Sequence, residues 1–202
     1  ESVLIVEEAV ADKLRAALTR AGAHILDEDG ARRLRDYMFT DGHLNTDVVG
    51  HDAAWIAGQA GLRVTPKTRV LIAPFSDVIT EEMLAHEKLS PVLTVYRADG
   101  FDAAAAQVAA IYSRQGAGHS VGLHAAPEAA DALALQLALT LPVARVIVNQ
   151  AHCIATGGSF DNGLPFSLSM GCGTWGGNSF SENLGYRHFL NITRIARPIP
   201  PR

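Results

Sequence analysis

The side chains best suited to acid–base or nucleophilic chemistry in this sequence are its histidines and cysteines. There are eight histidines and two cysteines, Cys153 and Cys172. No two histidines have the i, i+4 spacing of a zinc-binding helix, and no Cys-x-x-Cys motif occurs. The sequence therefore predicts no metal site, and any chemistry has to come from single histidines, thiols or carboxylates.

His119 is the histidine with the most suggestive local sequence. It follows Gly116-Ala117-Gly118 and stands at the entrance of an expected strand. An imidazole titrates near neutral pH and can transfer protons. Ligands of open α/β sheets, however, bind at the carboxyl ends of strands, so position alone leaves His119 either functional or structural.

The two thiols are open to different interpretations. Cys153 follows His152, and adjacent side chains on a strand point to opposite faces, so His152 is poorly placed to activate this thiol. A buried, apolar Cys153 is the favoured interpretation. Cys172 lies between two glycines that allow close backbone approach. It is either a nucleophile or, as we favour, a small packed residue.

A carboxylate of interest lies in the segment His86-Glu87-Lys88-Leu89-Ser90-Pro91, between a short helix expected at 80–86 and a strand. There Glu87 can accept hydrogen bonds from two hydroxyl groups, such as those of a ribose. The alternative is a solvated surface glutamate, which the residues alone favour.

Residues 150–180 are rich in glycine, serine and asparagine but also in aromatic side chains, which is untypical of a flexible linker. Their glycine pairs lack the spacing and the strand-to-helix setting of a phosphate-binding loop. The mixture of Phe166, Trp175 and small residues fits the wall of a small-molecule pocket. Packing in the core is the alternative.

The elements that must position these residues alternate between strands and helices. Continuous apolar runs predict strands at 2–7, 68–73, 91–96, 120–124 and 143–149, and helical spacing predicts helices at 9–21, 30–39, 52–60, 101–113 and 127–139. Crossover helices between buried strands are typical of a parallel sheet with helices on both faces. A helix at 181–186 and a strand at 189–197 are expected to end the chain.

Composition excludes several functional classes. The net charge of −4 argues against a nucleic-acid-binding surface. The absence of an 18-residue apolar run argues against a membrane span, and the first residues lack the basic region of a signal peptide. Two cysteines 19 positions apart form no disulfide framework and indicate a reducing, cytoplasmic setting.

Three motifs resemble one family. The segment 85–93 resembles the Glu-x-aromatic-Gly-Pro-Val motif of the aldehyde dehydrogenase superfamily, in the form typical of its CoA-acylating branch. Gly118-His119-Ser120 resembles the Gly-His-Thr/Ser of that branch. Residues 168–179 resemble its Gly-Cys-Gly-Ser/Thr-Trp-Gly-Gly-Asn-Ser signature, and residues 181–184 and 188–192 continue the match.

The resemblance implies a fold and a domain organisation. Residues 1–185 are expected to form a three-layer α/β catalytic domain with a parallel sheet, and residues 186–202 an arm whose strand joins a neighbouring subunit of a homo-oligomer. The Rossmann-like nucleotide domain of the family is absent from this sequence. The family's nucleophilic cysteine is expected about three to five residues before Glu1, and neither Cys153 nor Cys172 matches its position.

The resemblance also implies roles for single residues. Glu87 and His119 would be catalytic, with Glu87 holding the nicotinamide ribose of NAD or NADP. Leu89 would lie beside the nicotinamide, and His119 would move protons near the thiol. The residues that the resemblance places in the substrate pocket are Asn149, Phe166 and Trp175.

The implied reaction oxidises a small aldehyde to an acyl-CoA through a cysteine thioester. NAD or NADP accepts the hydride, and coenzyme A is the co-substrate that accepts the acyl group. This fragment is expected to be inactive alone. Residues 150–166 are similar to those of sulfoacetaldehyde and succinate-semialdehyde acylating enzymes, so Arg145 or His152 is a candidate for binding an anionic substrate. Two alternatives remain. One is a free-standing, non-catalytic module that binds or oligomerises, and the other is a thiol enzyme that uses Cys172 or Cys153.

Overall fold

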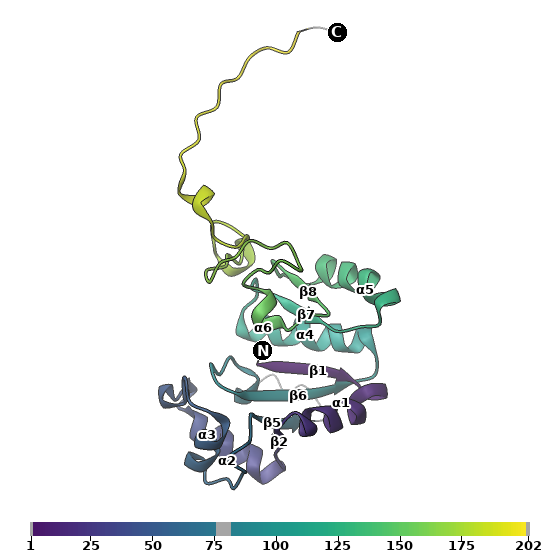
Figure 1. Cartoon of the computed structure of the whole chain (residues 1–202), viewed down its shortest axis with the longest axis vertical. Coiled ribbons are helices and arrows are strands. Elements are labelled where there is room, and N and C mark those ends of the chain that lie inside the picture. Colours follow the sequence, from purple (N-terminus) through teal and green to yellow (C-terminus); the bar gives the residue numbers. More distant parts are fainter. Residues whose placement is uncertain (1, 76–81, 201–202) are drawn as a thin grey trace. The chain divides into compact units, whose positions relative to one another are not determined.

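The computed structural model describes residues 2–75 and 82–200, and it divides into two compact units, Glu1–Gly116 (unit 1) and Ala117–Arg202 (unit 2) (Figure 1). The strands are β1 (Val3–Glu7), β2 (Ala23–Ile25), β3 (Phe39–Thr40), β4 (His43–Leu44), β5 (Val70–Phe75), β6 (Val92–Ala98), β7 (Val121–Leu123) and β8 (Val146–Val148). The α-helices are α1 (Glu8–Arg20), α2 (Glu28–Met38), α3 (Ala53–Gln59), α4 (Phe101–Gln115), α5 (Pro127–Thr140) and α6 (His152–Ala155). Four 3₁₀ turns complete the list: η1 (Thr46–Val48), η2 (Met83–Ala85), η3 (Thr174–Gly176) and η4 (Tyr186–Phe189).

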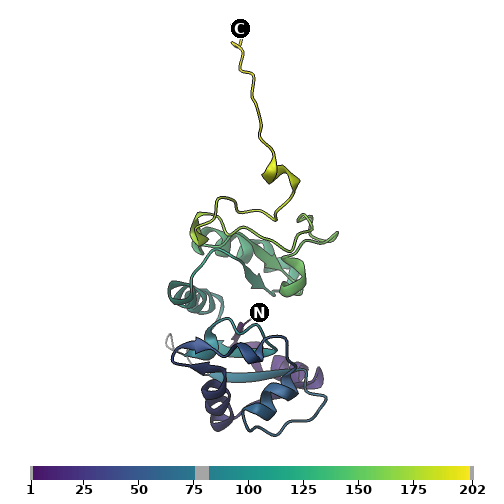
Figure 2. The same cartoon turned by 90° about the vertical axis from the view of Figure 1, so that its left-hand side faces the viewer.

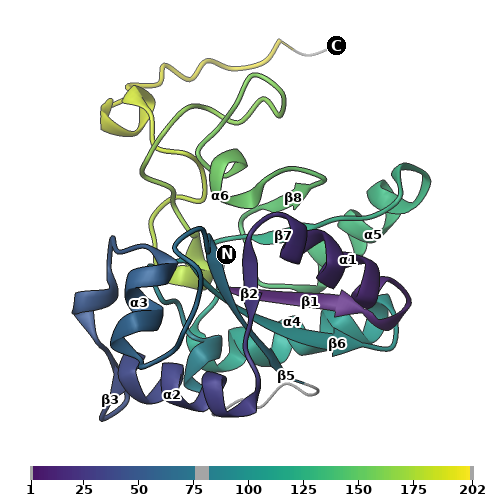
Figure 3. The same ribbon diagram turned by 60° about the horizontal axis from the view of Figure 1, so that its bottom comes forward.

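Unit 1 is built on a four-stranded parallel sheet with the strand order β1-β6-β5-β2. The chain crosses the sheet in one direction through α1 and returns through α2 and α3. Right-handed crossovers therefore place α1 on one face and α2 and α3 on the other. Helix α4 contacts β1 and β6, with α1 on the other side of these strands (Figure 3). The expected three-layer parallel α/β architecture is confirmed in this unit.

The larger hydrophobic core of unit 1 lies between the sheet and α2 and α3. Leu34, Met38, Ile56 and Leu71 are fully buried there. Both helices begin at an aspartate whose carboxylate caps the first turn: Asp27 Oδ1 accepts a hydrogen bond from the Gly30 amide at 2.8 Å, and Asp52 caps α3 in the same way. Such caps stabilise a helix by about 1 kcal/mol.

Unit 2 begins with a β–α–β arrangement. β7 and β8 pair in parallel and are joined by α5, which starts with Pro127 in its first turn, where a proline needs no hydrogen-bond partner. Residues 156–185 follow as irregular chain that folds back on itself through an antiparallel bridge between Met170 and Asn183. The residues after η4 run on as extended chain (Figure 2).

The structure confirms some of the expected elements and differs at others. The strands expected at 91–96, 120–124 and 143–149 all form, with β6 between β1 and β5 in unit 1 and β7 paired with β8 in unit 2. The helix expected at 181–186 is wrong: the buried Asn183 side chain is bonded to other parts of the loop, which holds this segment extended. The helix expected at 80–86 is a short 3₁₀ turn at Met83–Ala85, and residues 80 and 81 lie outside the described residues.

The C-terminal oligomerisation strand expected at 189–197 stays a prediction. No regular structure is assigned to residues 190–200, and a strand needs a hydrogen-bonding neighbour. The expected division into a domain of residues 1–185 and an arm of residues 186–202 likewise stays a prediction.

Candidate functional site

The two cofactor-site candidates of unit 1, Glu87 and Leu89, lie on the loop that leads from η2 into β6. Glu87 is exposed, and its carboxylate has no hydrogen-bond or ion-pair partner among the residues that the structure describes. Leu89 is 59% exposed and has a φ of 45°. The left-handed region costs a leucine about 1 kcal/mol or more, and such strain is typical of functional loops.

Lys88, which the sequence analysis did not single out, is fully buried between these two residues. Its Nζ donates hydrogen bonds to the carbonyl oxygens of Leu84 (2.6 Å), Ser2 (2.8 Å) and His86 (3.0 Å). Burial lowers the pKa of Lys88 from 10.5 to about 7, although Glu82 and Glu87 act to raise it. An inward Lys88 thus fixes the loop to the residue that precedes β1. No sequence signal indicates this burial, because lysines are rarely buried.

In unit 2, the buried guanidinium of Arg145 joins three segments of chain. It donates to the carbonyl oxygens of Gly171 (3.0 Å), His119 (3.3 Å) and Ser181 (3.4 Å), and to Oδ1 of Asn183 (3.0 Å). Burial lowers the pKa of Arg145, and Cys172 acts to raise it. Of the two candidates for binding a substrate anion, Arg145 is therefore engaged within the chain, because these contacts use four of its five N–H donors.

The glycines of residues 157–177 allow backbone segments to touch. A Cβ on Gly171 would lie 2.1 Å from the carbonyl oxygen of Phe180. A Cβ on Gly118 would lie 2.8 Å from both the Cys172 carbonyl oxygen and the Gly176 amide nitrogen. The Gly118–His119 turn thus packs directly on the loop that carries Cys172. That loop is closed by Asn178, whose Oδ1 accepts from the Cys172 amide at 2.7 Å.

This packing brings the exposed His119 next to the loop that carries Trp175, which is 55% exposed on η3. Nδ1 of His119 lies 2.5 Å from Oγ of the buried Ser120, and Nε2 of His152 lies 2.8 Å from the same oxygen. Two imidazoles therefore share one hydroxyl group. The His119 and Trp175 motifs, about 55 residues apart, lie together, whereas Glu87 and Leu89 belong to the other unit.

The expectation of a buried Cys153 is wrong. The Cys153 side chain is exposed, because residues 152–155 form helix α6 instead of a strand. His152 turns to Ser120, and Cys172 is free and half-buried against the Gly118 turn. Among the described residues, no cluster of three or more histidine, cysteine, aspartate or glutamate side chains has a metal-binding arrangement.

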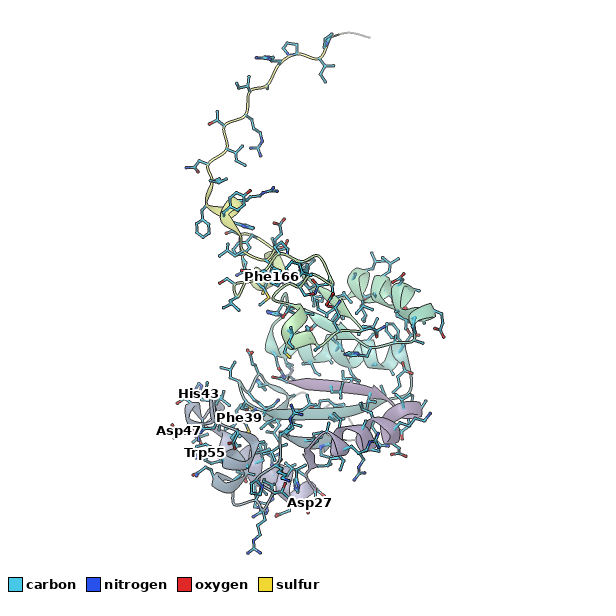
Figure 4. The ribbon with its side chains drawn as sticks, viewed as in Figure 1. Asp27, Phe39, His43, Asp47, Trp55 and Phe166 are labelled. Atoms are coloured by element: carbon cyan, nitrogen blue, oxygen red, sulfur yellow. The ribbon has the colours of Figure 1, made fainter. Side chains whose placement is uncertain are left out.

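The two remaining candidates for the substrate pocket, Asn149 and Phe166, differ in whether their side chains are available to a ligand. Asn149 has a φ of 51°, and its amide group forms two hydrogen bonds with the backbone of Ala125, at 2.9 and 3.0 Å, which ties the ends of β7 and β8 together. Phe166 lies in the irregular segment after α6, is 63% exposed and meets Phe160 edge-on with ring centroids 5.0 Å apart (Figure 4). Phe166 can meet a ligand directly, whereas both polar ends of the Asn149 amide already bond within the chain.

Known proteins are similar to this chain over nearly all of its length. An acylating sulfoacetaldehyde dehydrogenase from Cupriavidus necator is 52% identical over 201 residues, which are 98% of this chain and 40% of that protein. An acetylating succinate-semialdehyde dehydrogenase from Clostridium kluyveri is 37% identical over 91% of this chain and 40% of that protein. No family model matches.

A solved structure of a probable aldehyde dehydrogenase from Listeria monocytogenes has a TM-score of 0.90 and 32% identity, covering 100% of this chain and 44% of that one. The chain therefore spans about two fifths of the length of the relatives that it matches. Every helix in residues 2–75 and 82–200 is too short or too polar to cross a membrane. By sequence and by fold, this chain is a homologue of the acylating aldehyde dehydrogenases and corresponds to about two fifths of their length.

Proposed function

We propose that this chain supplies part of the active site of an enzyme that oxidises an aldehyde to an acyl-CoA, with NAD or NADP as the hydride acceptor. The observation that carries the proposal is the 52% identity to the acylating sulfoacetaldehyde dehydrogenase over 98% of this chain. The exposure of Glu87 and His119 supports it, because both groups remain accessible to ligands.

The residues of the Glu87 loop fit a nicotinamide ribose. The Glu87 carboxylate is accessible and can accept hydrogen bonds from two adjacent hydroxyl groups. The exposed Leu89 offers an apolar surface beside it, and the buried Lys88 holds both residues in place. The cofactor supplies the hydride-accepting ring, and the protein orients it through this loop.

In this proposal His119 acts as the base in the step in which the coenzyme A thiol attacks the acyl group. The exposed His119 imidazole is the group proposed to take the proton of the thiol, and Trp175 and Phe166 provide apolar surface for the acyl group. The acyl-carrying cysteine is neither Cys153, which lies on α6, nor Cys172, whose Cβ is packed at the Gly118 turn. We also propose a cytoplasmic protein, in keeping with two cysteines that are not joined in a disulfide.

We further propose an aldehyde that carries an anionic group. The names of the relatives from Cupriavidus necator and Clostridium kluyveri, sulfoacetaldehyde and succinate-semialdehyde dehydrogenases, support this class. Arg145 is excluded as the anion's ligand by its contacts within the chain. Comparing turnover of sulfoacetaldehyde, succinate semialdehyde and acetaldehyde tests the class, and a strong preference for acetaldehyde would contradict it.

The test uses a joined protein, in which this chain follows the preceding segment of the Cupriavidus homologue. In the joined protein we expect aldehyde alone to give at most one NADH per active site, and continued NADH formation to require both aldehyde and coenzyme A. We expect no NADH from the chain alone. Glu87→Gln should raise the KM for NAD about tenfold, because it weakens charge-assisted hydrogen bonds to the ribose. Glu28→Gln, an exposed carboxylate on α2, is the matched control. Turnover by the chain alone, or none by the joined protein, contradicts the proposal.

A further inference from the structure

The ammonium group of Lys88 is buried although two of the three oxygens that it contacts have another donor. Its Nζ donates to the carbonyl oxygens of Leu84, Ser2 and His86 at 2.6, 2.8 and 3.0 Å. Thr94 donates to two of them as well, through its amide to Ser2 at 3.0 Å and through its hydroxyl group to Leu84. Satisfying the backbone therefore does not account for burying a charged group there, which costs free energy.

The contacts of Lys88 determine the course of the loop that carries Glu87 and Leu89. The Lys88 side chain points inward, whereas the residues on either side of it are exposed. Leu89 has a φ of 45°, in the left-handed region that a leucine adopts where the surrounding structure holds it. The bond to Ser2 ties this strained loop to the start of β1. Hydrogen bonds from a charged donor are about twice as strong as neutral ones and are suited to holding such strain.

We propose that Lys88 is a positioning residue for the nicotinamide cofactor, and that it holds Glu87 and Leu89 in their binding conformation through its protonated amine, an inference that rests on the proposed role of the Glu87 loop. A protonated amine has three N–H donors, one for each carbonyl oxygen. A neutral amine has two N–H donors and a lone pair, which repels a carbonyl oxygen, so one of the three contacts is lost. The affinity for the cofactor should therefore fall as Lys88 loses its proton.

The surroundings of Lys88 bring this loss of a proton close to neutral pH. Burial lowers the pKa of Lys88 from 10.5 to about 7, while Glu82 and Glu87 act to raise it. Glu82 is buried and is paired with Arg35 of α2 at 3.0 Å, so its negative charge is shared between two cations. From the start of β1 the contact is an uncharged carbonyl group. The other titratable side chains next to this network belong to the loop and to β6, and they are His86 and Tyr96.

The first measurement follows the proton on Lys88 in this chain, which contains three lysines. In a chain labelled with ¹⁵N, the Nζ signal of Lys88 should titrate near pH 7. The exposed Lys13 and Lys67 supply reference signals. The reporters of the contacts are the amides of the three peptide groups whose carbonyl oxygens Lys88 binds, namely those of Val3, Ala85 and Glu87. We expect all three amide signals to move with the midpoint of Lys88.

Two variants show whether these signals report on Lys88. His86→Gln removes the neighbouring imidazole but keeps the backbone carbonyl, so the Val3 amide should still move with the Lys88 midpoint. In Lys88→Met the Val3 amide should no longer titrate near pH 7. A Val3 amide that does not respond to the titration of Lys88 in the unsubstituted chain would overturn the proposal. This readout does not depend on catalytic activity.

The second measurement is the KM for NAD of the joined protein. We expect it to rise about fivefold from about pH 6 to about pH 8, the effect of roughly one hydrogen bond. Lys88→Met should have the raised KM for NAD at both pH values and an unchanged KM for coenzyme A. Lys67→Met removes an exposed lysine of the same unit, so it is the matched control and should retain the pH dependence.

The outcomes separate this inference from the proposed function. A KM for NAD that does not change with pH in the unsubstituted protein, while Glu87→Gln still raises it, would overturn the role of Lys88. The same holds for an unchanged KM in Lys88→Met. Failure of the proposed function would appear as inactivity of the unsubstituted joined protein. Both pH titrations of the unsubstituted protein decide the question even where Lys88→Met does not fold.

Discussion

Replacing Arg145 by methionine is expected to lower the free energy of unfolding of unit 2 by about 3 kcal/mol or more. Methionine matches the arginine side chain only as far as Nε, and it offers no donors to the carbonyl oxygens of Gly171 and His119 or to Asn183. Each buried acceptor left unpaired costs about 1–3 kcal/mol. The same change should free the loop of residues 171–178 from the His119 turn and abolish activity in the joined protein.

The two tryptophans make the measurement specific, because Trp55 belongs to unit 1 and Trp175 to unit 2. With Trp55 changed to phenylalanine in every variant, urea unfolding followed by fluorescence reports on unit 2. Arg63→Met removes an exposed guanidinium and is the control, with an expected change within about 0.5 kcal/mol. Equal effects of the two substitutions would show that Arg145 does not organise the site.

Gly118→Ala is the second substitution that we expect to have a large effect on stability and activity. Its φ of +110° strains any side chain, and a Cβ would meet backbone atoms of Cys172 and Gly176 at 2.8 Å. Strain and overpacking together should cost about 2–4 kcal/mol. The substitution should also displace His119 from the loop and lower kcat in the joined protein.

Gly116→Ala is the matched control, two residues earlier. Gly116 also has a positive φ, of +90°, but nothing lies within 4 Å of a Cβ placed there. It should therefore show only the backbone strain, about 1 kcal/mol. Thermal unfolding of both variants measures the difference, and a Gly116→Ala as damaging as Gly118→Ala would contradict the close packing of the turn on the loop.

Local patterns predicted most of the regular structure. The apolar runs that became β1, β5 and β6 and the helical spacing in α4 and α5 are visible in short windows of sequence, because each element is set by its own period. The irregular segment was predicted only as a probable pocket wall. Its course depends on Arg145, which lies 26 residues from Gly171 and 38 from Asn183, and such long-range contacts leave no periodic signal.

The candidate site, like the fold, combines features that the sequence predicts with features that only long-range contacts reveal. Spacing alone left His119 and Glu87 ambiguous, and the family resemblance selected them. Two features escaped both kinds of reasoning. Lys88 is buried beside Glu87 because three carbonyl oxygens meet its ammonium group. His152 reaches Ser120 from α6, across 32 residues, so only the fold reveals that the two share a hydrogen bond.

We propose that His119 assists acyl transfer to coenzyme A from a cysteine other than Cys153 and Cys172. Intact-mass spectrometry of the joined protein, incubated with aldehyde and NAD and then with coenzyme A, tests it most directly. We predict an acyl adduct on a cysteine other than Cys153 and Cys172, discharged by coenzyme A and discharged at least a hundredfold more slowly in His119→Ala. An adduct on Cys172, or an unchanged rate of discharge in His119→Ala, would contradict the account.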